Sequence, residues 1–143
     1  MRMMHKKDLL SLYELSVDDL AAILYLARVV KEKYYHGENL DVLRHKTLLT
    51  FFEKPSLRTR ISFEVAMTQL GGHTIYYDTS TGPLGGKETI EDTARVVSRY
   101  VDIIAARFLH FSDTTKLANF SSVPVIDSLS DMHHPCQIIS DLF

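Results

Sequence analysis

Residues 47–70 read TLLTFFEKPSLRTRISFEVAMTQL, and this stretch decides the fold of the chain. The apolar run 47–52 is typical of a buried strand, and the spacing of apolar residues over 56–70 predicts a packed helix. Pro55 marks the corner between the two, and Ser56 stands at the expected N-cap. The sequence therefore predicts a strand, a sharp corner and a helix in immediate succession.

The start of this predicted helix carries the chemistry of a phosphate site. Two hydroxyl groups and two guanidinium groups fall close together, on Ser56, Thr59, Arg58 and Arg60. A helix start offers unpaired N–H groups and a partial positive charge, and arginine adds fixed, forked donors. The same pattern also fits an ordinary capped and solvated helix, so the rest of the chain has to decide between the two.

Length and composition bound the class of protein. With 143 residues and 45% hydrophobic content, the chain is expected to form one domain around one core. Sixteen Lys and Arg against eighteen Asp and Glu give a net charge of −2, which provides no general drive toward nucleic acid or an anionic membrane. The single cysteine, Cys136, excludes an intrachain disulfide, and no ligand spacing predicts a metal site. Any anion site must therefore be local.

The chain also lacks the patterns of a membrane span or a secretory signal. The longest apolar stretch, 20–30, contains Arg28 and is too short to cross a bilayer, and 1–7 has no apolar signal region. We expect a soluble, cytoplasmic protein without a targeting segment, although a trimmed organellar presequence would leave no trace.

Predicted helices and strands alternate along the chain. A first helix is expected to start at the N-cap Ser16, with Asp19 in a capping-box position, and to end by Gly37. Expected strands then cover 47–52, 73–77, 103–107 and 123–126, and expected helices cover 56–70, 89–100, 113–120 and a segment from about 135. Short strands separated by helices predict a doubly wound α/β fold, with a parallel four-stranded sheet covered by helices on both faces.

In this fold class, ligands bind beyond the carboxyl ends of the strands. The four predicted strands are followed by polar segments, which should share one rim of the sheet: 53–60, 78–87, Arg107 and 127–137. The second of these is rich in glycine and is the segment that we expect to be most mobile.

The motifs on this rim resemble the aspartate and ornithine carbamoyltransferase family. They are SLRTR at 56–60, LGGKETIEDTARV at 84–96, Arg107, and HPCQ at 134–137, in the order and spacing of the family. The resemblance covers the chain from about Leu9 to its last residue and implies the amino-terminal, carbamoyl-phosphate-binding domain, here 1–143. The residues EKP before the first motif, DTARV at 92–96 and the HPCQ form favour ornithine over aspartate as the second substrate.

The resemblance implies an enzyme of arginine metabolism. Such an enzyme transfers the carbamoyl group of carbamoyl phosphate to ornithine, giving citrulline and phosphate, without a metal or an organic cofactor. The family pattern implies that the phosphate is held by Ser56, the N–H of Leu57, Arg58 and Thr59, that Arg107 bridges phosphate and carbonyl oxygen, and that His134 and Gln137 hold the carbamoyl end. Thr59, Arg107 and His134 are the expected catalytic residues.

Three further residues are predicted to support the site. Arg60 should face away from Arg58 and form a salt bridge, with Glu64 as a candidate partner. Glu88 is a candidate partner for either arginine, and Lys87 is a candidate phosphate contact.

The chain departs from the family pattern in several places. Leu57 stands where ornithine enzymes usually carry threonine, which leaves acetylornithine, succinylornithine, putrescine and aspartate open as alternative amines. Pro83 stands where many relatives place a residue that reaches a neighbouring subunit, in enzymes that resemble trimers. We expect the second domain of the family, which binds the amine, to be missing from these 143 residues. We therefore expect half of an enzyme that is inactive alone, or else a non-catalytic phosphate-binding or oligomerising module.

Two other interpretations concern the segment before the last helix. Cys136 lies near His133 and His134 at a helix start, which would suit a thiolate nucleophile, but no acidic group stands in an evident place to orient the histidine. The two histidines with Asp131 also resemble metal ligands, although adjacent side chains point apart. We expect Cys136 to be a small, partly buried residue, and Asp131, like Asp127, to form hydrogen bonds within the loop.

Overall fold

The computed structural model describes residues 8–79, 84 and 88–143. Helices and strands alternate along this part of the chain, as predicted. Their bounds are η1, a 3₁₀ turn (Leu12–Glu14), α1 (Val17–Tyr35), β1 (Thr47–Phe52), α2 (Leu57–Gln69), β2 (His73–Asp78), α3 (Ile90–Val97), β3 (Ile103–Arg107), α4 (Phe111–Phe120), β4 (Val125–Asp127) and α5 (Pro135–Leu142). Within the described ranges, no helix has both the length and the apolar character that a membrane span requires.

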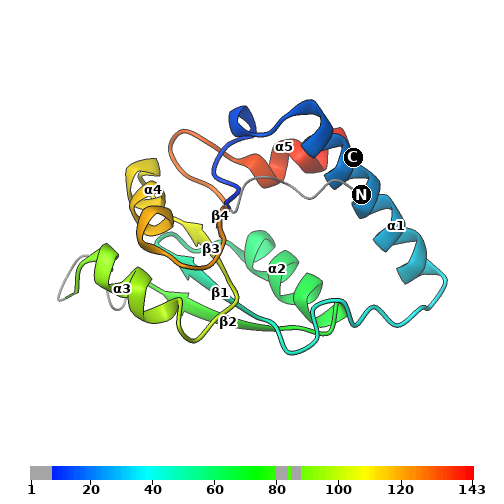
Figure 1. Ribbon diagram of the computed structural model, residues 1–143, viewed down its shortest axis with the longest axis horizontal. Helices are drawn as coiled ribbons and strands as arrows, with labels where there is room; N and C mark the ends of the chain where they lie inside the picture. The colour runs from blue at the N-terminus through cyan, green and yellow to red at the C-terminus, as the bar shows by residue number, and fades with distance from the viewer. Residues whose placement is uncertain (1–7, 80–83, 85–87) are drawn as a thin grey trace.

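The four strands form one parallel sheet in the order β2-β1-β3-β4 (Figure 1), which confirms the predicted sheet. The chain passes from β1 to the edge strand β2 and then returns to the other side of β1 as β3. The winding direction therefore reverses between β1 and β3, whose last residues, Phe52 and Arg107, are paired in the register. In open parallel sheets, ligands bind outside the carboxyl ends at such a reversal.

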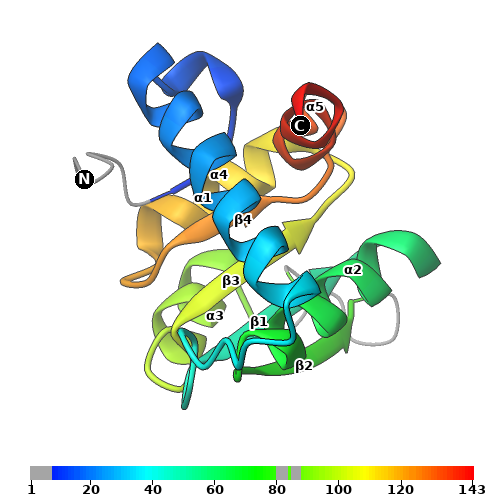
Figure 2. The ribbon, with the colours of Figure 1, turned by 90° about the vertical axis from the view of Figure 1, so that its right-hand side faces the viewer.

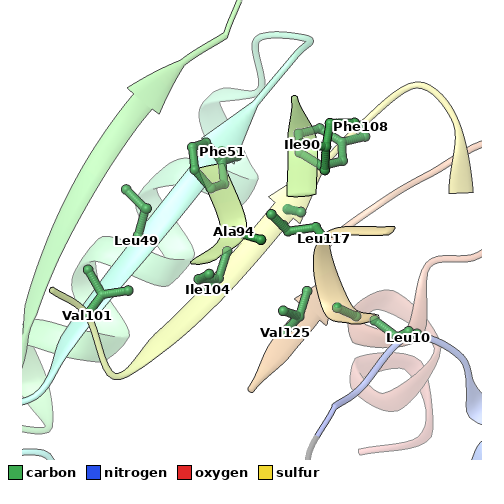
Figure 3. Close-up of a cluster of buried hydrophobic side chains, with 12 residues drawn as sticks. Leu10, Leu49, Phe51, Ile90, Ala94, Val101, Ile104, Phe108, Leu117 and Val125 are labelled. Carbon is green, nitrogen blue, oxygen red and sulfur yellow. The ribbon is translucent and has the colours of Figure 1, made fainter. Parts of the chain in front are cut away.

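Helices cover both faces of the sheet. Because successive residues of a strand point to opposite faces, Leu48 and Leu49 enter different clusters. Leu49 joins Ile104 in the main hydrophobic cluster under α3 and α4 (Figure 3), whereas Leu48 packs with Ala105 against Met67 of α2. Helices α1 and α5 lie on the same side of the sheet as α2 (Figure 2). The fold is the predicted doubly wound α/β class.

Several helix ends carry the local signals read from the sequence. Ser16 and Asp19 form a reciprocal capping box, in which each backbone N–H donates to the other side chain at 3.1 Å. Gly37 follows α1 with a φ of 71°, and Gly71 follows α2 with a φ of 83°. At Gly71 an added Cβ would lie 2.8 Å from the Asp41 carboxylate, so both the backbone angle and the space require glycine.

Three elements differ from the predicted bounds by two residues or more, and contacts distant in sequence explain two of them. Helix α4 begins at Phe111, two residues earlier than predicted, because the carboxylate of Asp131 accepts a hydrogen bond from the Phe111 N–H at 2.8 Å. Strand β4 covers Val125–Asp127 rather than 123–126, since the last N–H of the strand donates to the Leu9 carbonyl at 2.9 Å. Helix α3 is also shorter than predicted.

Candidate functional site

An open cavity of about 560 Å³ lies between the start of α2, the end of β3 and the start of α5. Its walls include most of the residues predicted to bind carbamoyl phosphate, namely Ser56, Arg58, Thr59, Arg107, His134 and Gln137. Segments far apart in sequence therefore meet at one rim, as the strand-end rule predicted. The side chain of Leu57 is outside the lining and is 74% exposed, so its only possible contribution is its backbone N–H.

The start of α2 presents hydroxyl groups and unpaired backbone donors. Ser56 occupies the N-cap position, but its side chain forms no capping hydrogen bond. Its Oγ donates instead to Thr59 Oγ1 at 3.0 Å, and Arg107 Nη1 donates to the same oxygen at 3.3 Å. Because Thr59 Oγ1 accepts both bonds, its own proton is available to donate. These groups and the helix dipole suit an anion.

Arg107 brings a partly buried positive charge to the end of β3. Burial lowers the pKa of its guanidinium group, but an arginine stays charged at neutral pH. Its Nε is buried without a hydrogen-bond partner among the described residues. A buried charged donor that lacks a partner is costly, so an anion in the cavity would satisfy it.

His134, the N-cap of α5, faces Arg107 across the cavity. Burial and the charge of Arg107 lower the pKa of the imidazole, which favours its neutral form. Its Nδ1 is also buried without a hydrogen-bond partner in the described part of the chain. A neutral imidazole carries one N–H donor and one acceptor, and the tautomer is set by the neighbours. The ring can therefore donate to an oxygen beside Arg107.

Gln137 lines the cavity from the first turn of α5, but its amide is already engaged. Its Nε2 donates to Asp141 Oδ1 at 2.7 Å, one turn further along the helix. The predicted contact with a carbamoyl amide therefore requires this exposed bond to open or to be shared.

The structure describes two of the three residues that were predicted to support the site, Arg60 and Glu88. Arg60 turns away from the cavity as predicted, with its Nε 2.8 Å from Glu64 Oε1 and its guanidinium 3.9 Å from the centre of the Tyr76 ring. The carboxylate of Glu88 accepts a hydrogen bond from the Thr93 hydroxyl at 3.4 Å and forms no ion pair with Arg58 or Arg60 among the described residues, so its support of either arginine stays a prediction. Lys87 and Pro83 lie outside the described residues.

Cys136 is unsuited to act as a nucleophile. Burial, with a smaller contribution from the nearby Asp127 carboxylate, raises the pKa of its thiol to about 11. A thiol of this pKa is protonated at neutral pH, and the thiolate is the reactive form. The ring of His133 packs edge-on against Phe111, with ring centres 4.6 Å apart. Among the described residues, no group of three or more His, Cys, Asp or Glu side chains could hold a metal ion.

Other residues of the cavity wall were missed by the sequence reasoning. They are Ser62, Phe63, Ala66, Ser128, Leu129 and Ser140. Those on α2 and α5 follow the functional residues at helical spacing of three or four, so this periodicity could have identified them. Ser128 and Leu129 lie on the turn after β4, and their position after a strand end was the only sequence signal that they lie near the site.

Together, the fold and the cavity define an α/β domain with a polar, cationic site at its topological switch point. Residues 7–143 match the family described as aspartate/ornithine carbamoyltransferase, carbamoyl-P binding domain, and the chain belongs to this family.

The relatives of this chain include ornithine carbamoyltransferases from several archaea. The chain is 50% identical to that of Archaeoglobus fulgidus over 136 residues, which covers 95% of this chain and 44% of the relative. The structure of the ornithine carbamoyltransferase from Pyrococcus furiosus superimposes with a TM-score of 0.93 at 46% identity, covering 95% of this chain and 44% of that one. The catalytic subunit of M. Jannaschii aspartate transcarbamoylase gives a TM-score of 0.87 at 35% identity, covering 96% of this chain and 45% of that one. The chain thus spans less than half the length of these relatives.

Proposed function

We propose that this chain binds carbamoyl phosphate in the cavity and is the carbamoyl-phosphate-binding part of an ornithine carbamoyltransferase. The observation that carries the proposal is a pair of buried nitrogens, Arg107 Nε and His134 Nδ1, that have no hydrogen-bond partner among the described residues and that lie on side chains lining the cavity. An anion at the helix start with a carbonyl oxygen beside it would satisfy both. Family membership over 7–143 supports the same ligand.

The geometry suits the chemistry of carbamoyl transfer. The attacking amine must be neutral, the carbonyl oxygen gains negative charge as the carbon becomes tetrahedral, and the phosphate then departs with its electron pair. Arg58, Thr59 and the N–H groups of α2 would hold the phosphate oxygens, while Arg107 and His134 would stabilise the carbonyl oxygen. Loss of one such donor typically costs about 3 kcal/mol in the transition state.

Ornithine is the proposed amine, because the relatives that match this chain at 47% and 50% identity are ornithine carbamoyltransferases. The amine would be bound by a further domain, since this chain corresponds to less than half of those proteins. We also propose a trimeric assembly, from the family resemblance, and a cytoplasmic location, which the single free cysteine supports.

Calorimetric titration of the purified chain with carbamoyl phosphate and with inorganic phosphate tests whether the chain binds the proposed ligand. We expect saturable binding that Arg58→Ala abolishes. Arg60→Ala is the matched control: it removes an arginine from the same helix that is paired with Glu64 outside the cavity. Absence of binding by a folded chain, or equal loss in both variants, would contradict the proposal.

A non-catalytic phosphate-binding module is the second candidate, because the donors that line the cavity account for binding of an anion without any transfer reaction. Incubation with carbamoyl phosphate and ornithine, followed by a citrulline assay, separates catalysis from binding. We expect binding without citrulline from this chain alone, and citrulline once the missing part of the relatives is supplied. Citrulline formed by this chain alone would refute the expectation that it is only a part of the enzyme.

A further inference from the structure

Asp127, the last residue of β4, is a buried carboxyl group for which the proposed transfer reaction has no role. Its side chain is 0% exposed. Its Oδ2 accepts a hydrogen bond from Ser130 Oγ at 2.8 Å, whereas Oδ1 has no hydrogen-bond partner in the described part of the chain. A buried carboxylate with one oxygen unsatisfied is costly to keep charged. Burial raises the pKa of Asp127 to about 6, although hydrogen bonding to the Ser130 side chain and to the Leu129 backbone lowers it in part.

Ser130 connects this carboxyl group to the backbone just before His134. Ser130 Oγ accepts a hydrogen bond from the His133 N–H at 3.2 Å, and the Ser130 N–H donates to the His133 carbonyl at 3.0 Å. These bonds close a tight turn that leads directly into the N-cap of α5. Ser128 and Leu129, at the beginning of the turn, line the cavity. The buried carboxyl group therefore anchors the segment that presents the imidazole.

The surroundings of Asp127 contain no compensating ion pair among the described residues. The titratable or charged groups on the elements around it are Asp131 and His133 in the turn, His134 and Cys136 at the start of α5, Arg107 at the end of β3 and Asp8 beside β4. His133 lowers the pKa of Asp127 and Asp131 raises it, but both act less strongly than burial. Burial therefore decides the protonation of this group.

We propose that Asp127 is a positioning residue, which holds through Ser130 the turn that presents His134, and that its protonated form favours anion binding because it adds no negative charge behind the cavity wall formed by Ser128 and Leu129. The ionised form predominates at neutral pH, so protonation strengthens binding as the pH falls through about 6. The inference rests on the proposed function, in which that anion is carbamoyl phosphate. The ionised form keeps the bond from Ser130, but its charge repels the ligand in a poorly hydrated setting. Protonation of Asp127 and anion binding therefore favour each other.

Two substitutions separate the hydrogen bond from the charge. Asp127→Asn keeps a carbonyl oxygen for Ser130 and is always neutral, whereas Asp127→Ala removes the acceptor. The measurement is the calorimetric affinity for carbamoyl phosphate and for inorganic phosphate between pH 5 and pH 8. We expect the affinity of the unsubstituted chain, divided by that of Asp127→Asn, to fall about tenfold across a midpoint near pH 6. This ratio cancels the ionisation of the ligand itself. Asp127→Ala should bind about tenfold more weakly throughout, which Asn rescues.

Asp131→Asn is the matched control, because Asp131 belongs to the same turn but is exposed and binds the Phe111 N–H. Asp131→Asn should keep the fall in affinity with rising pH, with a midpoint slightly below that of the unsubstituted chain because the Asp131 charge raises the pKa of Asp127. Circular dichroism establishes folding, and if Asp127→Ala fails to fold, Ser130→Ala removes the same bond and should show the same loss. Parallel pH profiles for the unsubstituted chain and Asp127→Asn would overturn the inference.

A failure of the proposed function would look different. A folded chain that binds neither ligand at any pH contradicts carbamoyl phosphate as the ligand, and the turn is then followed directly by nuclear magnetic resonance. The backbone amides of 128–134 should shift with a midpoint near pH 6 in the unsubstituted chain and not in Asp127→Asn. If these signals titrate identically in the two proteins, the link between Asp127 and the turn is wrong.

Discussion

The two sides of the cavity are built in different ways. On one side, the start of α2 places Ser56, Arg58 and Thr59 through a continuous stretch of local sequence. On the other side, the turn before α5 is held by contacts with β4, α4 and the segment near η1, including the Asp131 bond to the Phe111 N–H. A helix start can therefore form an anion site from a short motif. The side of the cavity that carries His134, here called the histidine side, depends on the completed fold.

Among the substitutions that compare the two sides, the largest effect is expected from removing the residue that joins them, Arg107. Arg107→Ala deletes the donor to Thr59 Oγ1 and the buried Nε beside the cavity. We expect affinity for both carbamoyl phosphate and inorganic phosphate to fall about a hundredfold, the range for charge-assisted hydrogen bonds in a poorly hydrated site. Calorimetry measures the change, and the thermal unfolding temperature controls for folding. Unaltered affinity for inorganic phosphate would mean that the helix start acts without Arg107.

The histidine side should show a pH dependence of stability that the helix start lacks. The pKa of Asp127 is about 6 in the folded chain and near 3.8 when unfolded, so the unfolded chain loses this proton first. The contribution of Asp127 to stability is therefore full below about pH 4, falls as pH rises to about 6, and is then constant. The lost free energy of unfolding is about 3 kcal/mol at most.

Urea unfolding between pH 4 and pH 8 tests this expectation. The free energy of unfolding of Asp127→Asn should vary less with pH than that of the unsubstituted chain. It should also be higher above pH 6, since the amide never ionises. Asp131 contributes a slope of the opposite sign, because hydrogen bonds from Phe111 and His110 lower its pKa. Asp131→Asn should therefore lose stability relative to the unsubstituted chain above pH 4. Equal slopes in all three proteins would show that neither carboxyl group is linked to folding.

A smaller change in affinity should show that the two sides of the cavity recognise different parts of the ligand, the phosphate and the carbonyl oxygen. His134→Ala removes the imidazole beside the expected carbonyl oxygen but leaves the helix start unchanged. We expect affinity for carbamoyl phosphate to fall about tenfold and affinity for inorganic phosphate to change by less than about twofold. Competition between the two ligands measures the difference directly. An equal loss for both would assign His134 to the phosphate and remove the functional distinction between the two sides.

The same contrast explains how much the sequence could predict. The bounds of Thr47–Phe52 and Ile103–Arg107 were predicted to the residue, because each is a short, mainly apolar segment bounded by charged residues. The SLRTR motif, together with the family resemblance, led to the α2 side of the cavity. Sequence patterns do not report burial at a strand end, so Asp127 was expected to be only a hydrogen-bonding loop residue.

Partners of long polar side chains were harder still to predict. The Arg60 pair with Glu64 lies within one helical turn and was predicted, since residues four apart share a face. Glu88 was assigned to an arginine across the rim, but its contact is with Thr93, five residues away. Gln137 was assigned to the ligand, yet Asp141 holds its amide. In both cases a nearby partner of the same helix region competes with the more distant one.

The smallest expected effect is at Arg60. It tests whether anion binding at the start of α2 depends only on the donors that face the cavity. Arg60 belongs to the same motif as Arg58, but its guanidinium stacks on Tyr76 and pairs with Glu64, outside the cavity lining. Exposed pairs of this kind contribute little to stability. Arg60→Ala should therefore bind carbamoyl phosphate within about twofold of the unsubstituted chain, and the difference should shrink further at high salt because the pair is solvent-exposed. A loss as large as that of Arg58→Ala would mean that the positive charge of the whole helix start, and not the geometry of its cavity-facing donors, attracts the anion.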